Sequence, residues 1–161
     1  MSPEALPDLT DLLSAGAMCT RIVSTVEVGT TLETAARVMR ETHVGCVVVV
    51  DELEGESRVA GVLTDRDITV SAVALGLDAR VLRAGDLMTR DVVTVREDDP
   101  LGIVLDRMRE RGIRRVPVVS PTGGLVGLVS FDDLQAALFL QVHAMTEVLV
   151  AGRMNEVARR A

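Results

Sequence analysis

The sequence predicts an α/β protein made of two β-α-β-β-α repeats packed sheet to sheet, plus a C-terminal helix. Three observations carry this prediction: an internal duplication, the alternation of β-rich and helical stretches in each copy, and a composition that suits a packed core. The chain has 161 residues, of which 48% are hydrophobic and 25% are charged. One repeat alone is small and buries little surface, so we expect the two copies to share one core.

The duplication becomes visible when the sequence is shifted by 69 residues. Thr20-Arg21 then falls on Thr89-Arg90, and Met39-Arg40-Glu41 falls on Met108-Arg109-Glu110. The register changes to 66 after a longer turn in the first copy, where Gly61-Val62-Leu63-Thr64 falls on Gly127-Leu128-Val129-Ser130. A match that holds one register and then resumes it indicates two copies of one structural unit.

Each copy predicts the same order of elements. The β-branched runs from Cys46 to Val50 and from Val116 to Val119 are typical of strands buried on both faces. A helix is expected after Thr31, which suits an N-cap, and another from Pro100, which suits the first helical position, up to Gly112. The remaining strands are expected at residues 23–26, 59–63, 92–95 and 125–129.

The repeats divide the chain into five segments. We expect a polar N-terminal arm at 1–13, repeat 1 at 14–76, a linker at 77–85, repeat 2 at 86–140 and a helical tail at 141–161. Apolar residues recur at helical spacing toward the tail, and Gly152 is a candidate break. This stripe has two interpretations, packing on the protein's own core, which is favoured, or a dimer face. The residues are Leu134, Leu138, Val142, Met145 and Leu149.

Composition argues against several classes of function. The formal net charge is −7 and aromatic residues make up 1% of the chain, which disfavours nucleic acid as a partner. Every basic residue is an arginine, so a Schiff-base or phosphate-loop lysine is excluded. The N-terminus has no basic leader, and the apolar run from Cys46 to Val50 is far too short to span a membrane. We expect a cytoplasmic protein with no membrane partner.

Few side chains suggest reactive chemistry. Cys19 and Cys46 are too few for a disulfide scaffold, and His43 and His143 lack the neighbours of a triad or a metal site. We interpret Cys46 as a core residue, and Cys19 as a loop residue with the alternative role of a reactive thiol. The sequence therefore predicts no catalytic residue, no metal site and no cofactor.

Two equivalent motifs follow the third expected strand of each copy, and both read glycine, two apolar residues, Thr or Ser, two further residues and Asp. In the simpler interpretation, the hydroxyl and the carboxylate form a capping box at the start of a helix. In the alternative, amide groups at the helix N-terminus bind phosphate while the carboxylate accepts hydrogen bonds from a ribose. Repetition of the motif favours the alternative. The residues are Thr64 and Asp67 in the first copy and Ser130 and Asp133 in the second.

These motifs, with the strands from Val44 to Val50 and from Ile113 to Val119, resemble a tandem pair of cystathionine-β-synthase (CBS) domains, or Bateman module. The resemblance covers nearly the whole chain and is strongest in the second copy. The first copy departs from the family by having Val48 where proline is common. The resemblance implies pseudo-two-fold symmetry and two clefts between the copies.

The resemblance also implies an adenosine-containing ligand, such as AMP, ADP, ATP or S-adenosylmethionine. By position, Thr64 and Asp67 would serve one cleft and Ser130 and Asp133 the other, with each aspartate holding a ribose. The starts of the first strands would contact adenine, and the starts of the second strands would line the clefts. These further residues are Ile22, Val23, Asp91, Val92, Gly45, Cys46, Arg114 and Arg115.

Phosphate groups need cations, and the candidates are Arg66, Arg114 and Arg115. Arg114 and Arg115 alternate along an expected strand, so we expect only one of them to reach a given cleft. A solvated surface role is the alternative for each arginine. The second copy has Asp132 where the first has Arg66. Because Asp132 would repel phosphate, we expect the Thr64 cleft to suit phosphorylated ligands better.

Three hypotheses of function follow. The leading one is a non-catalytic regulatory module that binds an adenosyl nucleotide and signals by a conformational or oligomeric change, as a homodimer or through a separate effector protein. The second is a ligand-free structural or dimerisation protein that uses the same fold and the tail. The third is an enzyme or redox sensor based on Cys19, for which the sequence shows no base or resolving thiol.

Overall fold

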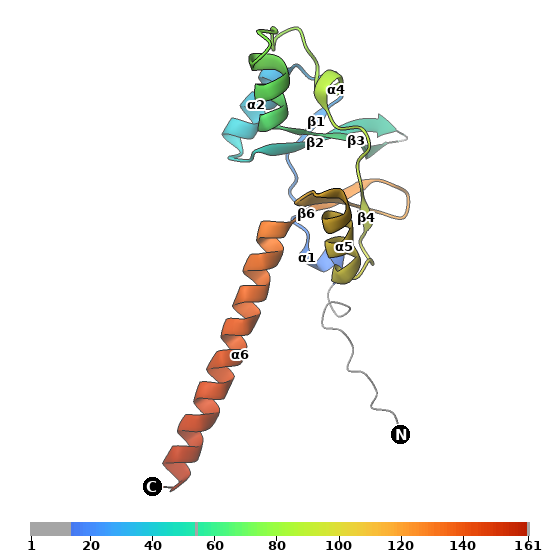
Figure 1. Ribbon diagram of the computed structural model, residues 1–161. Coiled ribbons are helices and arrows are strands. Elements are labelled where there is room, and N and C mark those ends of the chain that lie inside the picture. Colours follow the sequence, from blue (N-terminus) through green and yellow to red (C-terminus); the bar gives the residue numbers. More distant parts are fainter. Residues whose placement is uncertain (1–13, 54, 161) are drawn as a thin grey trace. The chain divides into compact units, whose positions relative to one another are not determined.

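The computed structural model describes residues 14–53 and 55–160, so the expected polar arm at 1–13 lies outside the described residues. The chain forms two compact units, one up to Val129 and the other from Ser130 onward. The first unit contains two three-stranded sheets, and the second is formed by one long helix (Figure 1). The predicted fold class is confirmed.

The first sheet has the strand order β1-β2-β3 and belongs to the first repeat. β1 (Thr25–Glu27) pairs in parallel with β2 (Cys46–Leu53), and β2 pairs antiparallel with β3 (Glu56–Thr64). The parallel pair needs a crossover connection, which α2 (Leu32–Glu41) supplies. The side chain of Thr31 accepts a hydrogen bond from the amide of Thr34, which confirms the predicted N-cap.

The second sheet repeats this plan with the order β4-β5-β6. β4 (Val95–Arg96) pairs in parallel with β5 (Arg115–Val119), and β6 (Leu125–Ser130) lies on the other side of β5. The crossover helix α5 (Leu101–Arg111) ends at Gly112, whose φ of 63° is the left-handed conformation that glycine favours. Pro100 is the N-cap and not the first helical residue as expected, because its ψ of 153° is extended.

Short helices complete the first unit. α3 (Asp65–Ile68) follows β3 and continues into the π-helix η2 (Thr69–Val73). α1 (Ala15–Met18) and α4 (Ala84–Leu87) precede the first strand of each repeat. The sequence pattern predicted neither of these two helices, since four residues are too few to show a helical period.

The central strands are deeply buried within the first unit. Val47, Val48 and Val49 in β2 are 0% exposed, and so are Val116 and Val118 in β5. This confirms the prediction of strands buried on both faces. Each such side chain stabilises the fold by about 1.5–3 kcal/mol relative to an exposed one.

The leading segment of each repeat is bonded to the opposite repeat. The amide of Gly16, in α1, donates to the carbonyl of Glu97 at 2.9 Å, beyond the end of β4. The amide of Gly85, in α4, donates to the carbonyl of Val28 at 2.9 Å, beyond the end of β1. The two bonds are equivalent in the 69-residue register, so the repeats exchange their leading segments with pseudo-two-fold symmetry.

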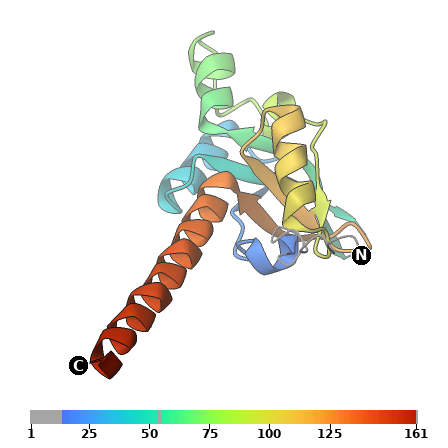
Figure 2. The ribbon, with the colours of Figure 1, turned by 60° about the horizontal axis from the view of Figure 1, so that its bottom comes forward.

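The second unit is α6 (Phe131–Arg160), one continuous helix that Gly152 does not interrupt (Figure 2). The large apolar side chains from Leu138 to Val150 are between 45% and 73% exposed. Leu134, the first residue of the predicted stripe, is 1% exposed, and the two interpretations of the stripe both stay predictions. The exposed residues are Leu138, Phe139, Leu140, Val142, Met145, Val148, Leu149 and Val150.

The stretch from Phe131 to Arg153 is long and apolar enough to cross a membrane by length and composition, with a mean hydropathy of 1.4. No unbroken apolar run marks this stretch, because polar residues such as Gln141, His143 and Glu147 interrupt it. The expectation of no membrane partner rested on unbroken runs, so the absence of a membrane partner stays a prediction.

Candidate functional site

A cleft of about 630 Å³ lies within the first unit, between the two repeats. This volume falls in the range of small-molecule sites, about 300–1,000 Å³. The first repeat contributes residues at the end of β3 and the start of α3. The second repeat contributes the segment after α4 and residues 111–115, which connect α5 to β5. The cleft is therefore built by both copies, as the sequence predicts for a ligand that bridges them.

Thr64 and Asp67 form a capping box on the floor of this cleft. The hydroxyl of Thr64 donates to Oδ2 of Asp67 at 2.7 Å, and the amide of Asp67 donates back to the Thr64 Oγ1 at 3.2 Å. The amide of Thr64 also donates to Oδ2 of Asp67, at 2.9 Å. Both bonds that the Asp67 carboxylate accepts fall on Oδ2, so Oδ1 is the atom with which Asp67 can accept from a ligand. The capping and ligand interpretations are therefore compatible.

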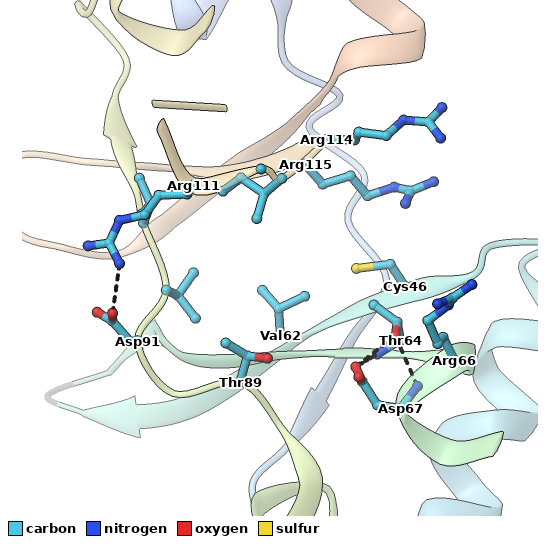
Figure 3. A pocket seen from close by; sticks show the side chains of 14 residues that line it. Cys46, Val62, Thr64, Arg66, Asp67, Thr89, Asp91, Arg111, Arg114 and Arg115 are labelled. Atoms are coloured by element: carbon cyan, nitrogen blue, oxygen red, sulfur yellow. Dashed lines mark hydrogen bonds and ion pairs between the residues drawn. The ribbon is translucent and has the colours of Figure 1, made fainter. Parts of the chain in front are cut away.

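The cleft carries more positive than negative charge. Arg66, Arg111, Arg114 and Arg115 line it, against Asp67 and Asp91. Figure 3 shows Thr64, Asp67 and Arg66 toward one end of the cleft and Asp91 and Arg111 toward the other. Arg111 donates to Asp91 at 2.9 Å, and their side chains are 53% and 83% exposed. The arginines offer planar donor groups suited to carboxylate or phosphate oxygens.

Cys46 is a buried residue at the start of β2 that also lines the cleft. Burial raises the pKa of its thiol; nearby Arg115 opposes this shift, and Asp67 and Asp65 add to it. A raised pKa keeps the thiol protonated at neutral pH, so Cys46 presents a small apolar surface and a weak nucleophile. This agrees with its interpretation as a core residue.

The structure brings most of the predicted binding residues together. Both Arg114 and Arg115 line the cleft, whereas strand alternation predicts one. β5 begins at Arg115, so Arg114 lies in the preceding loop and the alternation of a strand does not apply to it. The predicted residues that line the cleft are Cys46, Thr64, Arg66, Asp67, Asp91, Val92, Arg114 and Arg115.

Other predicted residues are not among those that line this cleft. Ile22 is 92% exposed, and the carbonyl of Gly45 accepts a hydrogen bond from the amide of Asp65 at 3.1 Å. Ser130 and Asp133 lie in the second unit, where the Ser130 hydroxyl donates to Asp133 at 2.6 Å at the start of α6. The remaining residue is Val23. The roles of these residues in a second cleft stay predictions.

Sequence reasoning did not select six residues that line the cleft. The duplication could have indicated Val62 and Thr89, because it aligns Val62 with Leu128 and Thr89 with Thr20. In the structure Val62 forms an antiparallel bridge with Thr89, and Thr20 forms the equivalent bridge with Leu128. Arg111, Gly112 and Ile113 occupy the turn between α5 and β5, where a sequence pattern does not show which way a side chain points. The sixth residue is Val93.

The fold and the cleft define a tandem-repeat protein with a small-molecule site between its halves. The family model of the CBS domain matches residues 11–72 and 84–140, most of the chain and both repeats. The chain therefore belongs to the CBS-domain family, and it carries a tandem pair of these domains.

Relatives of known name and structure agree with this assignment. Hypoxic response protein 1 of Mycobacterium tuberculosis is 34% identical over 141 residues, which are 88% of this chain and 90% of the relative. The crystal structure of hypoxic response protein I with two coordinated zinc ions has a TM-score of 0.68 and 33% identity, over 78% of this chain and 98% of that chain. Among the described residues of this protein, no group of three or more His, Cys, Asp or Glu is placed to hold a metal ion.

Two further solved structures contain adenosyl ligands. The cytosolic domain of the Mg2+ channel MgtE in complex with ATP is 32% identical with a TM-score of 0.65, over 77% of this chain and 48% of that chain. The CBS domain pair of MJ0100, in complex with 5'-methylthioadenosine and S-adenosylmethionine, is 24% identical with a TM-score of 0.69. It covers 80% of this chain and 98% of that chain, and it supports the fold.

Proposed function

We propose that this protein is a non-catalytic regulatory module that binds a phosphorylated adenosine nucleotide in the cleft at Thr64 and Asp67. The observation that carries the proposal is the charge of this cleft, which is lined by four arginines and only two aspartates. A guanidinium grips phosphate oxygens with paired, charge-assisted hydrogen bonds. MgtE, whose cytosolic domain was solved with ATP, supports the ligand class.

The parts of the cleft suit different parts of such a ligand. Oδ1 of Asp67 can accept from a ribose hydroxyl, because the capping bonds use Oδ2. Val62, Val92 and Ile113 offer aliphatic walls for a purine ring, and Arg66 and Arg115 offer donors for phosphates. Aliphatic side chains replace aromatic stacking here, since aromatic residues make up only 1% of the chain.

Charge favours nucleotides over S-adenosylmethionine in this cleft. S-adenosylmethionine carries a positive sulfonium, which the arginines repel, whereas the phosphates of AMP, ADP or ATP are negative. The positions equivalent to Arg66, Arg111, Arg114 and Arg115 in the 69- and 66-residue registers hold Asp132, Thr42, Gly45 and Cys46. Both motifs thus keep the hydroxyl and the acid. The four arginines, in contrast, all lie at the cleft of Thr64 and Asp67, and no arginine stands at the equivalent positions.

Binding experiments on the full chain test this proposal. Titration calorimetry should show ATP and AMP binding more tightly than adenosine, and adenosine at least as tightly as S-adenosylmethionine. Arg115→Ala should weaken ATP binding by about 10- to 150-fold and leave adenosine binding unchanged, as loss of a charge-assisted bond of about 1.5–3 kcal/mol implies. Arg107→Ala is the matched control, because Arg107 is an exposed α5 residue that pairs with Glu110 and does not line the cleft.

Asp67→Asn tests the ribose contact separately from the phosphate contact. This variant should weaken adenosine and ATP by a similar factor, because the ribose is common to both ligands. Equal affinity of the wild type and of both cleft variants would refute the assignment of the cleft. Mass spectrometry of small molecules released from the purified protein would identify the natural ligand.

We further propose that the signal passes to a second copy or to a separate effector protein in the cytoplasm. The second candidate function, a ligand-free dimerisation protein, is favoured by the exposed apolar side chains of α6. The two functions differ in one measurement. Association that responds to ATP supports the regulatory module, whereas association that ignores every nucleotide supports the dimerisation protein.

A further inference from the structure

Three arginines gather at one end of the cleft. Arg66 lies in the first turn of α3, Arg115 is the first residue of β5, and Arg114 lies in the loop before it. Figure 3 shows their side chains toward the end of the cleft where Cys46 and Thr64 also lie, so both repeats contribute cations to one place. Within the described part of the chain, neither Arg66 nor Arg115 forms an ion pair, which leaves both guanidinium groups available to an anion.

The two carboxylates of the cleft are already engaged. Oδ2 of Asp67 accepts from the amide and the hydroxyl of Thr64, at 2.9 and 2.7 Å, and the proposed function assigns Oδ1 to a ribose hydroxyl. Oδ2 of Asp91 accepts from Arg111 at 2.9 Å, toward the end of the cleft opposite to Arg66 (Figure 3). Among the residues that line the cleft, no carboxylate is thus left to hold a cation beside the three arginines.

This set of polar groups does not suit a magnesium ion. Mg²⁺ requires oxygen ligands in near-octahedral geometry, and proteins hold it through one or two carboxylates together with the phosphates of a ligand. Within residues 14–53 and 55–160, no three or more His, Cys, Asp or Glu side chains are grouped to hold a metal ion. The arginines also repel a divalent cation, because like charges interact unfavourably at short range.

Mg²⁺ and guanidinium groups compete for the same atoms of a nucleotide. In solution, a nucleoside di- or triphosphate binds Mg²⁺ through its terminal phosphates. The ion covers oxygens that a guanidinium would otherwise grip in a bidentate fork. Its charge also cancels part of the negative charge of the ligand, which weakens the attraction to arginines.

We propose that this cleft binds nucleoside di- and triphosphates in their metal-free form, with Arg66, Arg114 and Arg115 in place of the magnesium ion. The proposal rests on the nucleotide-binding function proposed above and adds the ionic form of the ligand. The protein and Mg²⁺ then compete for one pool of ATP, so occupancy by ATP falls as the concentration of Mg²⁺ rises. AMP, whose single phosphate binds Mg²⁺ weakly, keeps its affinity, so Mg²⁺ shifts the preference of the cleft toward AMP.

Titration calorimetry of the full chain tests the proposal in two buffers, one with EDTA and one with Mg²⁺ in excess over ATP. ATP should bind at least about tenfold more weakly in the magnesium buffer, whereas AMP should bind with the same affinity in both. The buffers need equal ionic strength, because salt screens the arginines. ATP binding that Mg²⁺ leaves unchanged or tightens would overturn the proposal.

The paramagnetic ion Mn²⁺ gives a second readout of the same competition. Free hydrated Mn²⁺ has a sharp electron paramagnetic resonance signal, which weakens when the ion binds ATP. The wild-type protein, added in large excess to Mn²⁺ and ATP, should release the ion and raise the signal. The Arg66→Ala/Arg115→Ala double variant should release less. A signal that falls further with the wild type would indicate a ternary complex with bound metal and would overturn the proposal.

Asp91→Asn tests the alternative in which Asp91 leaves Arg111 and holds the metal ion of the nucleotide. The ratio of the ATP affinities in the two buffers should be the same in this variant as in the wild type. Loss of ATP binding in the magnesium buffer alone would assign the metal to Asp91 and contradict the metal-free form. Asp106→Asn is the matched control, because Asp106 pairs with Arg109 and does not line the cleft.

The two ligands separate this proposal from the proposed function. If AMP and ATP both bind in EDTA, and Mg²⁺ does not weaken ATP, the metal-free form is refuted and nucleotide binding stands. If neither ligand binds in either buffer, the nucleotide-binding function is refuted together with this inference.

Discussion

Val62 and Thr89 exchange two backbone hydrogen bonds across the repeats, with N–O distances of 3.1 and 2.9 Å. Leu128 and Thr20, their equivalents in the duplication, exchange the same two bonds at 3.0 Å each. The residues before Val62 and Leu128 are Gly61 and Gly127, and a side chain at either position would collide with the segment from the other repeat. A Cβ on Gly127 would come within 3.0 Å of the carbonyl oxygen of Thr20.

Gly127→Ala should therefore destabilise the fold by about 1–3 kcal/mol, the cost of overpacking a tight contact. Gly61→Ala should act similarly, because its Cβ would overlap the side chain of Met88. Gly29→Ala is the control, since its Cβ would meet no atom within 4 Å. Urea denaturation measures all three, and a Gly127→Ala protein as stable as wild type would contradict the tight contact.

The hydroxyl of Thr64 should contribute to stability even without a ligand. Thr64→Ala removes the cap that accepts from the Asp67 amide, so the free energy of unfolding should fall by about 1 kcal/mol. Thr64→Ser keeps the hydroxyl and should restore most of the loss. Thermal unfolding without nucleotide makes the comparison, and identical midpoints for the alanine and serine variants would show that the cap does not act.

Asp91 should compete with phosphate for Arg111. Asp91→Asn removes one negative charge from the cleft and frees Arg111 from its ion pair, so ATP should bind several-fold more tightly. Stability should change by less than about 1 kcal/mol, because both partners are more than half exposed. Asp106→Asn, which breaks an exposed pair with Arg109 outside the cleft, is the control for the calorimetric titration.

The thiol of Cys46 should report on pH and on the ligand. Its pKa is raised in the folded protein, so the folded state holds the proton more tightly and stability should fall as pH rises above 9.0, the ordinary pKa of the thiol. In a Cys19→Ser background, alkylation by iodoacetamide should be slow at pH 7.5, and ATP should slow it further because Cys46 lines the cleft. Fast alkylation that ATP leaves unchanged would contradict both points.

Patterns that repeat along the chain predicted the elements, and local geometry set their ends. The apolar run beginning at Cys46 marked β2, but the strand extends to Leu53 because it pairs with β3 beyond the buried part. The run at 92–95 predicted a full strand, whereas β4 contains only Val95 and Arg96. Propensity marks a buried stretch, but ladder pairing with a neighbouring strand decides where a strand begins and ends.

The binding residues also fall into two groups, those that a sequence pattern predicts and those that tertiary packing brings to the cleft. Thr64 and Asp67 belong to a repeated motif, so the sequence indicated them directly. Arg111 and Thr89 enter the cleft because tertiary packing places the turn after α5 and the segment after α4 on its walls. A sequence alone does not fix that packing.

The exchanged segments bear on how such a chain arises. A single repeat carrying its own leading turn could not use that turn on its own sheet, since Gly16 bonds to Glu97 and Gly85 to Val28. Two identical copies would satisfy each other by swapping these turns, and a gene fusion would then join them covalently. The present polypeptide has the architecture of such a fused ancestral homodimer. Two halves that are encoded separately can differ in charge, as the arginines that line the described cleft and the residues at the equivalent positions do.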